Sequence, residues 1–237
     1  MNILILGVTS SIGQSIAIEF APKNSLFLLL RDIESNNSSL LKQNILSSGG
    51  ESVTLIQGDL GEDYNKTIKK IMVYDYDILI NAASSTSNLN DNVIRPFNFK
   101  YYTRVDLLNP LSLLKTIYEH KTDKILTVIF ISTVLSKVDS PNNNIYSSYK
   151  ILHEEYIKGL KREYGQNFSY KIIYIGSRIR RDKTSKKTEK IARLARKTLA
   201  NSSNTFYYGL EGKILMLLNN ISPIITRLII FLSRVIK

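Results

Sequence analysis

Short apolar runs recur along the chain and alternate with segments of helical periodicity. These runs cover residues 2–6, 26–30, 53–56, 77–80, 125–131, 170–175 and 205–208. Continuous apolar runs of this length, bounded by turn residues, are typical of strands buried on both faces of a sheet. Strands that alternate with helices predict a parallel sheet with right-handed crossovers and helices on both faces. The pattern therefore predicts an α/β fold, a Rossmann-type doubly wound parallel sheet of about seven strands.

Five segments between these runs have apolar residues at helical spacing. They cover residues 16–20, 39–46, 62–72, 102–119 and 146–164. Pro110 lies inside the fourth segment, and we expect it to bend that helix. No internal repeat or linker divides the chain. We therefore predict one α/β domain over residues 1–212, whose ligand the motifs below indicate, followed by an amphipathic helical tail over residues 213–237.

The first apolar run ends in a glycine turn, Gly7-Val-Thr-Ser-Ser-Ile-Gly13, and a helical segment follows it. Gly7 permits a tight turn, and Gly13 lets the helix begin close to the strand. Backbone N–H groups at such a helix start can bind a pyrophosphate. An ordinary strand-to-helix turn without a ligand is the alternative. The residues that would line the phosphate site are Gly7, Thr9, Ser10, Ser11, Ile12 and Gly13.

The second apolar run ends in Arg31-Asp32, where dinucleotide-binding folds contact the adenosine ribose. An acidic residue alone at this point favours NAD, whereas Arg31 can pair with the 2′-phosphate of NADP. We therefore favour NADP(H) as the cofactor, with NAD(H) as the alternative because of Asp32. A solvated strand end without a ligand also fits this pattern.

A phenol and an amine lie four residues apart in Tyr146-Ser-Ser-Tyr-Lys150. On a helix, two such positions lie one turn apart on the same face. An ammonium group beside a phenol favours the phenolate, so we expect Lys150 to lower the pKa of Tyr146. A phenol with a lowered pKa can act as a proton donor and acceptor near neutral pH.

Four features follow one another along the chain: the glycine turn, Asn81 after the fourth run, Ser132-Thr133 after the fifth run, and the Tyr146-x-x-x-Lys150 motif. In this arrangement, residues 1–180 resemble the short-chain dehydrogenase/reductase family. The resemblance implies an NAD(P)-dependent oxidoreductase that acts on an alcohol or carbonyl group. It also implies a homodimer formed through the helices around residues 102–119 and 146–164.

The resemblance implies a role for individual residues. Tyr146 would exchange a proton with the substrate oxygen, and Lys150 would lower the pKa of Tyr146 and contact the nicotinamide ribose. The family has a hydroxyl thirteen positions before this tyrosine, which is Thr133 here, with Ser132 as the second candidate. Asp59 would contact the adenine. The other cofactor contacts would come from Leu60, Asn81, Ala82, Ala83 and Gly176.

The chain departs from the family pattern at several points. Asp106 stands where the family has a catalytic asparagine, and Asn109 lies one turn further on as an alternative. The middle glycine of the phosphate turn is Ser11, and the family's Asn-Asn-Ala-Gly motif is Asn81-Ala-Ala-Ser84. These departures support a second class of function, a non-catalytic dinucleotide-binding scaffold or sensor.

The formal net charge of +12 is concentrated in the last quarter of the chain. Residues 178–197 contain ten Lys or Arg against two acidic residues. This segment follows the sixth strand, where the family has its substrate lid. It can be a solvated helix, or it can bind substrate phosphates through Arg178, Arg180 and Arg181. We do not expect nucleic acid as a partner, since no aromatic residues are interleaved with the charges.

The chain has no cysteine and only two histidines, so we expect no thiol chemistry and no metal site. Its first residues contain no basic segment ahead of the apolar run. We interpret this run as the first strand and not as a signal peptide, and we therefore expect a cytoplasmic protein.

The segment from Lys213 onward is densely apolar, but Pro223, Arg227 and Arg234 interrupt it. A membrane-spanning helix needs about 20 uninterrupted apolar residues. We therefore predict two short amphipathic helices in a membrane interface, where cations including Lys213 and Lys237 suit anionic headgroups. A helix that covers the core or a subunit interface is the alternative.

The tail and the Gly-x-Thr-Ser-Ser-Ile turn resemble one subset of the family, in which a membrane-associating tail accompanies reduction of keto sugars for surface-polysaccharide synthesis. The resemblance implies an NADP(H)-dependent ketoreductase on the inner face of the membrane. Its substrate would be a keto sugar, a nucleotide sugar or a lipid-linked sugar. A soluble reductase of small ketones with a dimerising tail is the alternative.

Overall fold

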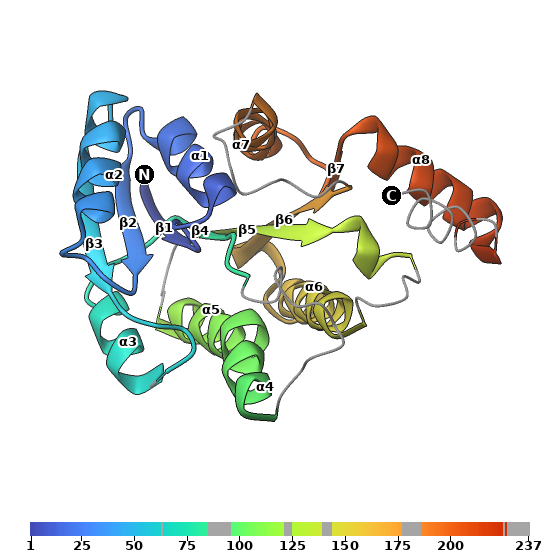
Figure 1. Ribbon diagram of the computed structural model, residues 1–237, viewed down its shortest axis with the longest axis horizontal. Coiled ribbons are helices and arrows are strands. Elements are labelled where there is room, and N and C mark those ends of the chain that lie inside the picture. The colour runs from blue at the N-terminus through green and yellow to red at the C-terminus, as the bar shows by residue number, and fades with distance from the viewer. Residues whose placement is uncertain are drawn as a thin grey trace.

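The computed structural model describes residues 1–62, 64–84, 96–120, 125–138, 144–176, 186–224 and 226. Its strands are β1 Asn2–Leu6, β2 Ser25–Leu30, β3 Ser52–Gln57, β4 Ile78–Asn81, β5 Leu126–Thr133, β6 Phe168–Ile175 and β7 Thr205–Tyr208. They form one seven-stranded sheet in the order β3-β2-β1-β4-β5-β6-β7 (Figure 1). Every pairing is parallel. The predicted doubly wound parallel sheet is confirmed.

Helices cover both faces of the sheet. The α-helices are α1 Ser11–Phe20, α2 Asn36–Ser47, α3 Tyr64–Ile71, α4 Pro96–Thr103, α5 Asn109–His120, α6 Asn144–Tyr164, α7 Lys186–Thr198 and α8 Leu210–Ile221. Helices α1, α2 and α7 lie on one face, and α3, α5 and α6 lie on the other. Helix α8 follows β7 and projects beyond the edge of the sheet.

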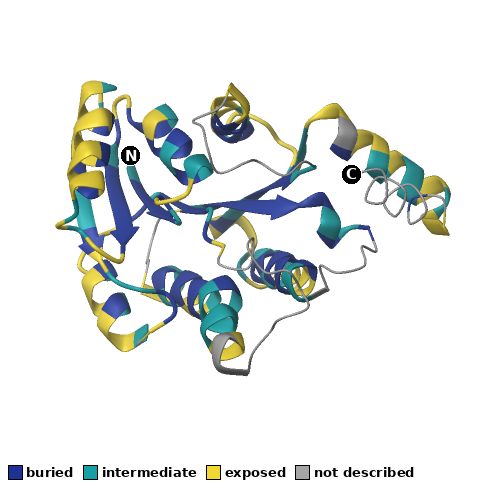
Figure 2. Cartoon of the chain, in the orientation of Figure 1, coloured by how far each residue is buried: buried dark blue, intermediate teal, exposed yellow. Residues whose placement is uncertain are grey.

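The central strands are largely apolar because each of them buries both of its faces. In β1, Leu4 and Leu6 pack toward α5 and α6, whereas Ile3 and Ile5 pack toward α1 and α2. Successive side chains of a strand point to opposite faces, so a continuous apolar run supplies two cores at once. Figure 2 shows the central strands as the most buried part of the chain.

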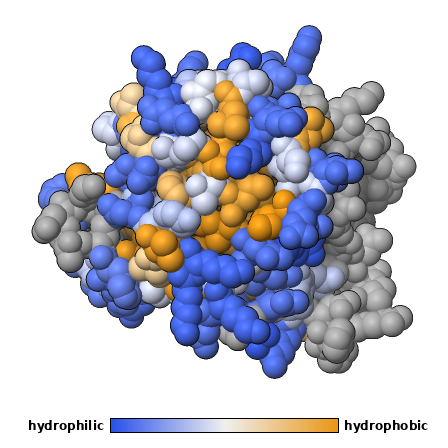
Figure 3. All heavy atoms as spheres, turned by 90° about the vertical axis from the view of Figure 1, so that its left-hand side faces the viewer, coloured by the Kyte–Doolittle hydropathy of each residue, from blue (hydrophilic) through white to orange (hydrophobic). Residues whose placement is uncertain are grey.

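The edge strand β3 closes the sheet beside α2 and α3. Only Val53 and Ile56 of this strand are buried, one toward each face, so β3 is less covered than the central strands are. Figure 3 looks at this side of the molecule and shows apolar side chains in the middle of the face, surrounded by hydrophilic ones. An edge strand has one neighbour fewer, and its side chains are correspondingly less covered.

The helix predicted over residues 102–119 is divided into three pieces. Between α4 and α5 the chain forms a π-helix, Arg104–Leu108, which the Asn109 amide closes by donating to the carbonyl of Arg104. Pro110 lies in the first turn of α5. Because proline has no N–H, Pro110 cannot donate to the carbonyl of Asp106, four residues earlier. The expected distortion therefore lies just upstream of the proline, at the turn that contains Asp106.

The start of α8 packs against the carboxyl edge of the sheet. A methyl group placed on Gly212 would lie 3.1 Å from the Val134 side chain and 3.4 Å from the Cα of Gly176. Helix α8 begins at Leu210 and ends before Pro223, so the tail helix starts three residues ahead of the expected position. No helix within the described ranges is long and apolar enough to cross a membrane. Arg178, Arg180, Arg181, Arg227, Arg234 and Lys237 lie outside the described residues.

Candidate active site

The glycine turn after β1 lies against the end of β4. Gly7 has a φ of +78°, and a Cβ there would lie 2.5 Å from the Ala83 amide nitrogen. A Cβ on Gly13 would lie 2.3 Å from the carbonyl oxygen of Gly7. Both distances are far shorter than any van der Waals contact, so only glycine fits at either position. The strand order reverses between β1 and β4, and such switch points are where these sheets bind nucleotides.

The amino end of α1 has the geometry of a phosphate site. Ser10 is the N-cap: its hydroxyl oxygen accepts from the Gly13 amide at 3.0 Å, and its hydroxyl donates to the Gly7 carbonyl at 2.8 Å. Thr9 and Ser10 are exposed, and Ser11 and Ile12 are half-buried. The amides of Ser11 and Ile12 lie in the first turn, where a helix supplies no acceptor of its own. These residues fit the pyrophosphate of a dinucleotide.

Arg31 follows β2 and Asp59 follows the neighbouring strand β3, and Tyr101 of α4 joins them. The Tyr101 hydroxyl lies 3.3 Å from both carboxylate oxygens of Asp59, and its ring covers Gly61. Burial and then the Asp59 carboxylate raise the pKa of Tyr101, whereas Arg31 acts in the opposite sense. Asp32 accepts a hydrogen bond from the Glu34 amide, so it starts the turn into α2.

Asn81 fixes the end of β4. Its side-chain oxygen accepts from the Ala83 amide at 3.0 Å, and its Nδ2 lies 3.3 Å from Nε2 of His153. The ring of His153 stacks on Phe130 at 4.2 Å. Burial, followed by the nearby Lys150 ammonium, lowers the pKa of His153 to about 3, so this side chain is neutral at pH 7. The neutral ring therefore serves as a packing and hydrogen-bonding group.

Lys150 is the buried cation of the site, with 3% of its surface exposed. Its Nζ donates to the carbonyls of Ile131 at 3.2 Å and Ala83 at 3.4 Å, which ties α6 to the ends of β5 and β4. The same nitrogen lies 4.7 Å from the centre of the Phe130 ring and 5.7 Å from that of Tyr146. Burial lowers the pKa of Lys150, and the carboxylates of Asp106 and Glu154 oppose this effect.

The expected lowering of the Tyr146 pKa is wrong for this structure. Burial raises the pKa of Tyr146 well above its ordinary value, and the Asp106 carboxylate raises it further. The phenol loses solvent when α6 packs onto the sheet, and the carboxylate disfavours a second negative charge beside it. Tyr146 is consequently a neutral phenol across the physiological pH range.

The two hydroxyls at the end of β5 have different environments. The Ser132 hydroxyl donates to the carboxylate of Glu154, so it is directed away from the catalytic role considered for it. Thr133 is the N-cap of the short turn that follows β5, and its oxygen accepts from the Leu135 amide at 3.3 Å. This contact uses a lone pair of Thr133 and leaves its O–H to donate. The Ser132 hydroxyl is therefore already committed to a carboxylate, whereas the contact of Thr133 does not use its proton.

Asp106 is buried in the π-helix, close enough to affect the pKa values of both Tyr146 and Lys150. The alternative, Asn109, is directed elsewhere: its amide donates to the carbonyl of Leu60 at 2.6 Å. Gly176, the last cofactor candidate, follows β6 and lies beside the start of α8. Among the described residues, no cluster of three or more His, Cys, Asp or Glu side chains could hold a metal ion.

A sequence profile of the short chain dehydrogenases matches residues 1–177. The chain belongs to this family. Short-chain dehydrogenases are NAD(P)-dependent oxidoreductases, and this chain is therefore assigned to that class of enzyme. No curated protein matches the chain.

Solved structures of this family share the fold of the chain at low sequence identity. A short-chain dehydrogenase from Streptomyces avermitilis has a TM-score of 0.75 and 15% identity, over 93% of this chain and 92% of its own. The landomycin C-6 ketoreductase LanV, solved with NADP and rabelomycin, has a TM-score of 0.72 and 16% identity, over 87% and 93%. A 3-oxoacyl-[acyl-carrier protein] reductase from Brucella melitensis has a TM-score of 0.70 and 18% identity, over 89% and 96%.

In this short-chain dehydrogenase, Glu154 is a fully buried carboxylate beneath the end of β5. It accepts hydrogen bonds from the hydroxyls of Ser132, Ser136 (2.8 Å) and Tyr174 (2.7 Å), and it pairs with the Lys137 ammonium at 2.7 Å. The Ser136 oxygen also lies 2.7 Å from the carbonyl oxygen of Thr133, so its single proton is shared between that carbonyl and Glu154. The cluster thus joins α6 and β6 to the turn that follows Thr133.

Sequence reasoning did not identify Glu154, His153 or Tyr101. A signal for the first was present, because Tyr146, Lys150 and Glu154 are spaced four residues apart and share one helix face. His153 lies on the same face, seven residues after Tyr146. Tyr101 had no such signal, since its contact with Asp59 crosses from α4 to the end of β3.

Replacement of Glu154 should destabilise the fold far more than replacement of its exposed neighbour. We expect Glu154→Ala to lower the free energy of unfolding by about 3 kcal/mol, because it leaves three buried hydroxyls and an ammonium without their common acceptor. Glu155 pairs with Lys158 at the surface, so Glu155→Ala should cost at most about 0.5 kcal/mol. Urea unfolding measures both variants, and equal midpoints would contradict the role assigned to Glu154.

Proposed function

We propose that the chain is an NADP(H)-dependent ketoreductase with Tyr146 as its proton donor. The observation that carries the proposal is the position of Lys150, which holds the ends of β4 and β5 together directly beneath the ring of Tyr146. The same strand end, at Ala83, lies against the glycine turn. Cofactor site and proton donor thus share one edge of the sheet.

The reduction needs a proton donor, a group that polarises the carbonyl and a hydride. When bound, the dinucleotide supplies the hydride. Thr133 would donate a hydrogen bond to the carbonyl oxygen of the substrate and orient it. Tyr146 is neutral, because its pKa is raised, and therefore carries the proton that the reduced oxygen requires. As Tyr146 gives up that proton, the ammonium of Lys150 would stabilise the phenolate.

Arg31 supports NADP(H) over NAD(H). Arg31 is exposed just after β2, and its charge opposes the rise in the pKa of Tyr101. Because the Tyr101 hydroxyl contacts Asp59, Arg31 lies at the adenosine end of the proposed site. Asp32 is partly satisfied by the Glu34 amide, which leaves less of its capacity for a ribose hydroxyl. LanV, a ketoreductase with the same fold, was solved with NADP.

The proposed substrate is a carbonyl compound that carries phosphate, namely a keto sugar, a nucleotide sugar or a lipid-linked sugar for surface polysaccharide. Support comes from the cations of α7 and from the exposed apolar residues of α8, both near the carboxyl edge of the sheet. We place the enzyme in the cytoplasm, on the inner face of the membrane. A soluble reductase of small ketones is the alternative, and it would bind no vesicles.

We also propose a homodimer formed through α4, α5 and α6. Helix α6 exposes Ile151 (41%) and Leu152 (53%), and the neighbouring turns expose Phe99 (44%) and Leu108 (51%). These helices lie together on one face of the sheet (Figure 1). Light scattering should give twice the chain mass of 27.0 kDa, and a monomer mass would reject this arrangement.

Removal of the Tyr146 hydroxyl tests the mechanism. Tyr146→Phe should reduce the rate of keto reduction at least a thousandfold, because the proton donor is lost, while NADPH binding changes less than about threefold. Tyr149→Phe is a matched control, since this neighbouring hydroxyl contacts Thr103 at 2.6 Å, away from the proposed chemistry. Retained turnover in Tyr146→Phe would favour another mechanism. NADPH binding by the wild type without turnover of any ketone would favour the scaffold or sensor.

The choice of cofactor depends on Arg31. We expect Arg31→Ala to weaken NADPH binding more than tenfold, because a charge-assisted bond to the 2′-phosphate is lost. NADH, which has no 2′-phosphate, serves as the internal control and should bind equally well to both proteins. Fluorescence titration measures both affinities. A wild type that binds NADH more tightly than NADPH would overturn the assignment.

A further inference from the structure

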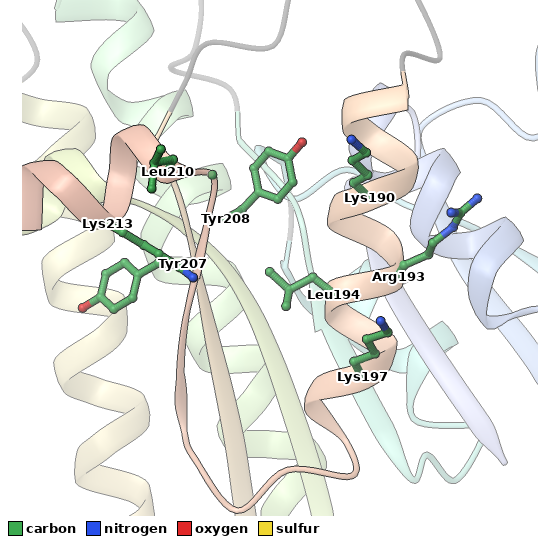
Figure 4. Close-up of a pocket in the computed structure, with 9 residues that line it drawn as sticks. Lys190, Arg193, Leu194, Lys197, Tyr207, Tyr208, Leu210 and Lys213 are labelled. Atoms are coloured by element: carbon green, nitrogen blue, oxygen red, sulfur yellow. The ribbon is translucent and has the colours of Figure 1, made fainter.

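A basic groove lies between α7 and the end of β7. Its volume is about 520 Å³, within the range of ligand sites. The lining side chains include four cations, Lys190, Arg193, Lys197 and Lys213. In Figure 4, Leu194 of α7 and Tyr208 of β7 point toward one another between the two elements, with Lys190 at the same end as Tyr208. The groove thus combines positive charge with an apolar floor.

The positive charge of the groove is poorly compensated. None of the described residues that line it carries a carboxylate. The nearest described acid on α7, Glu189, pairs with Arg193 at 3.7 Å, and both side chains are more than half exposed. An exposed pair of this kind neutralises little of the field. The groove therefore attracts an anion.

An exposed apolar stripe begins where the groove ends. Leu210 lines the groove and is 72% exposed, and Ile214, Leu217 and Ile221 follow at spacings of four, three and four residues. Their exposed fractions are 46%, 62% and 71%, and Ile224 beyond them is 76% exposed. This spacing places the α8 residues on one face of the helix. Figure 2 shows exposed residues along the length of α8.

We propose that the groove and the stripe form a docking site for an anionic phospholipid bilayer. The apolar stripe would enter the interface, while the groove takes a lipid phosphate. The proposal rests on the membrane contact put forward above and names its chemistry. A second copy of the chain fits the surface less well, because paired grooves would bring eight cations together.

Docking in this way would orient the active site. The start of α8 packs against Val134 and Gly176, which flank the carboxyl ends of β5 and β6. Thr133 precedes Val134 directly. A bilayer against α8 would therefore lie beside the rim of the substrate site, within reach of a lipid-linked carbonyl compound.

Vesicle flotation of the full-length protein tests the docking site. The wild type should float with phosphatidylcholine vesicles that contain phosphatidylglycerol and should float far less with phosphatidylcholine alone. We expect the triple variant Lys190→Gln, Lys197→Gln, Lys213→Gln to partition about 100-fold more weakly, since each cation near the surface contributes about fivefold. The control variant Lys42→Gln, Lys66→Gln, Lys69→Gln loses the same charge from α2 and α3 and should partition within about threefold of the wild type.

A stripe variant and an activity assay complete the test. Leu217→Gln, Ile221→Gln should also lose flotation, because both side chains are exposed and would enter the interface. Reduction of a water-soluble ketone that carries no phosphate should be unchanged in the groove variant, so failure of docking and failure of the reductase proposal give different results. Equal flotation of groove and control variants would overturn the proposal. A wild type that does not float with the anionic vesicles would also overturn it. So would a dimer in solution that the stripe variant disrupts and the groove variant does not.

Discussion

The buried ammonium of Lys150 is the constraint on which the rest of the site depends. A desolvated cation is costly unless its donors are satisfied, and here the carbonyls of Ala83 and Ile131 accept from it while two aromatic rings flank it. The carbonyls come from the ends of adjacent strands, so satisfying one lysine fixes β4, β5 and α6 relative to one another. The position of Tyr146 above the edge of the sheet follows from that requirement.

Two further contacts make the same edge rigid. Gly7 approaches Ala83 so closely that no side chain fits between them, which places the phosphate turn against the strand end that Lys150 holds. Glu154, one helical turn beyond Lys150, binds the turn after Thr133 through Ser132 and Ser136. The proposed cofactor site, carbonyl-polarising hydroxyl and proton donor thus lie along one edge of the sheet, and α6 contributes both Lys150 and Glu154 to the contacts that hold it.

The electrostatics of the site differ from what the motif alone implies. An isolated lysine beside a tyrosine lowers the pKa of the phenol, but here burial and the carboxylate of Asp106 dominate and raise it. A neutral phenol suits the role of proton donor that is proposed for Tyr146. The same carboxylate favours the charged form of Lys150, which burial disfavours. Asp106 therefore stabilises both the neutral phenol and the charged ammonium.

The sequence by itself determined the succession of strands and helices along the chain, the glycine positions and the shared face of Tyr146 and Lys150. Each of these follows from local spacing, because continuous apolar runs form buried strands and a step of four residues is about one helical turn. Only the tertiary structure decided which hydroxyl is available, since Ser132 and Thr133 differ solely in what lies across from them. The direction of the Tyr146 pKa, the contact of Tyr101 with Asp59 and the groove between α7 and β7 were likewise beyond prediction. Each depends on burial or charge contributed by segments that are distant in the chain, and no local pattern encodes these distances.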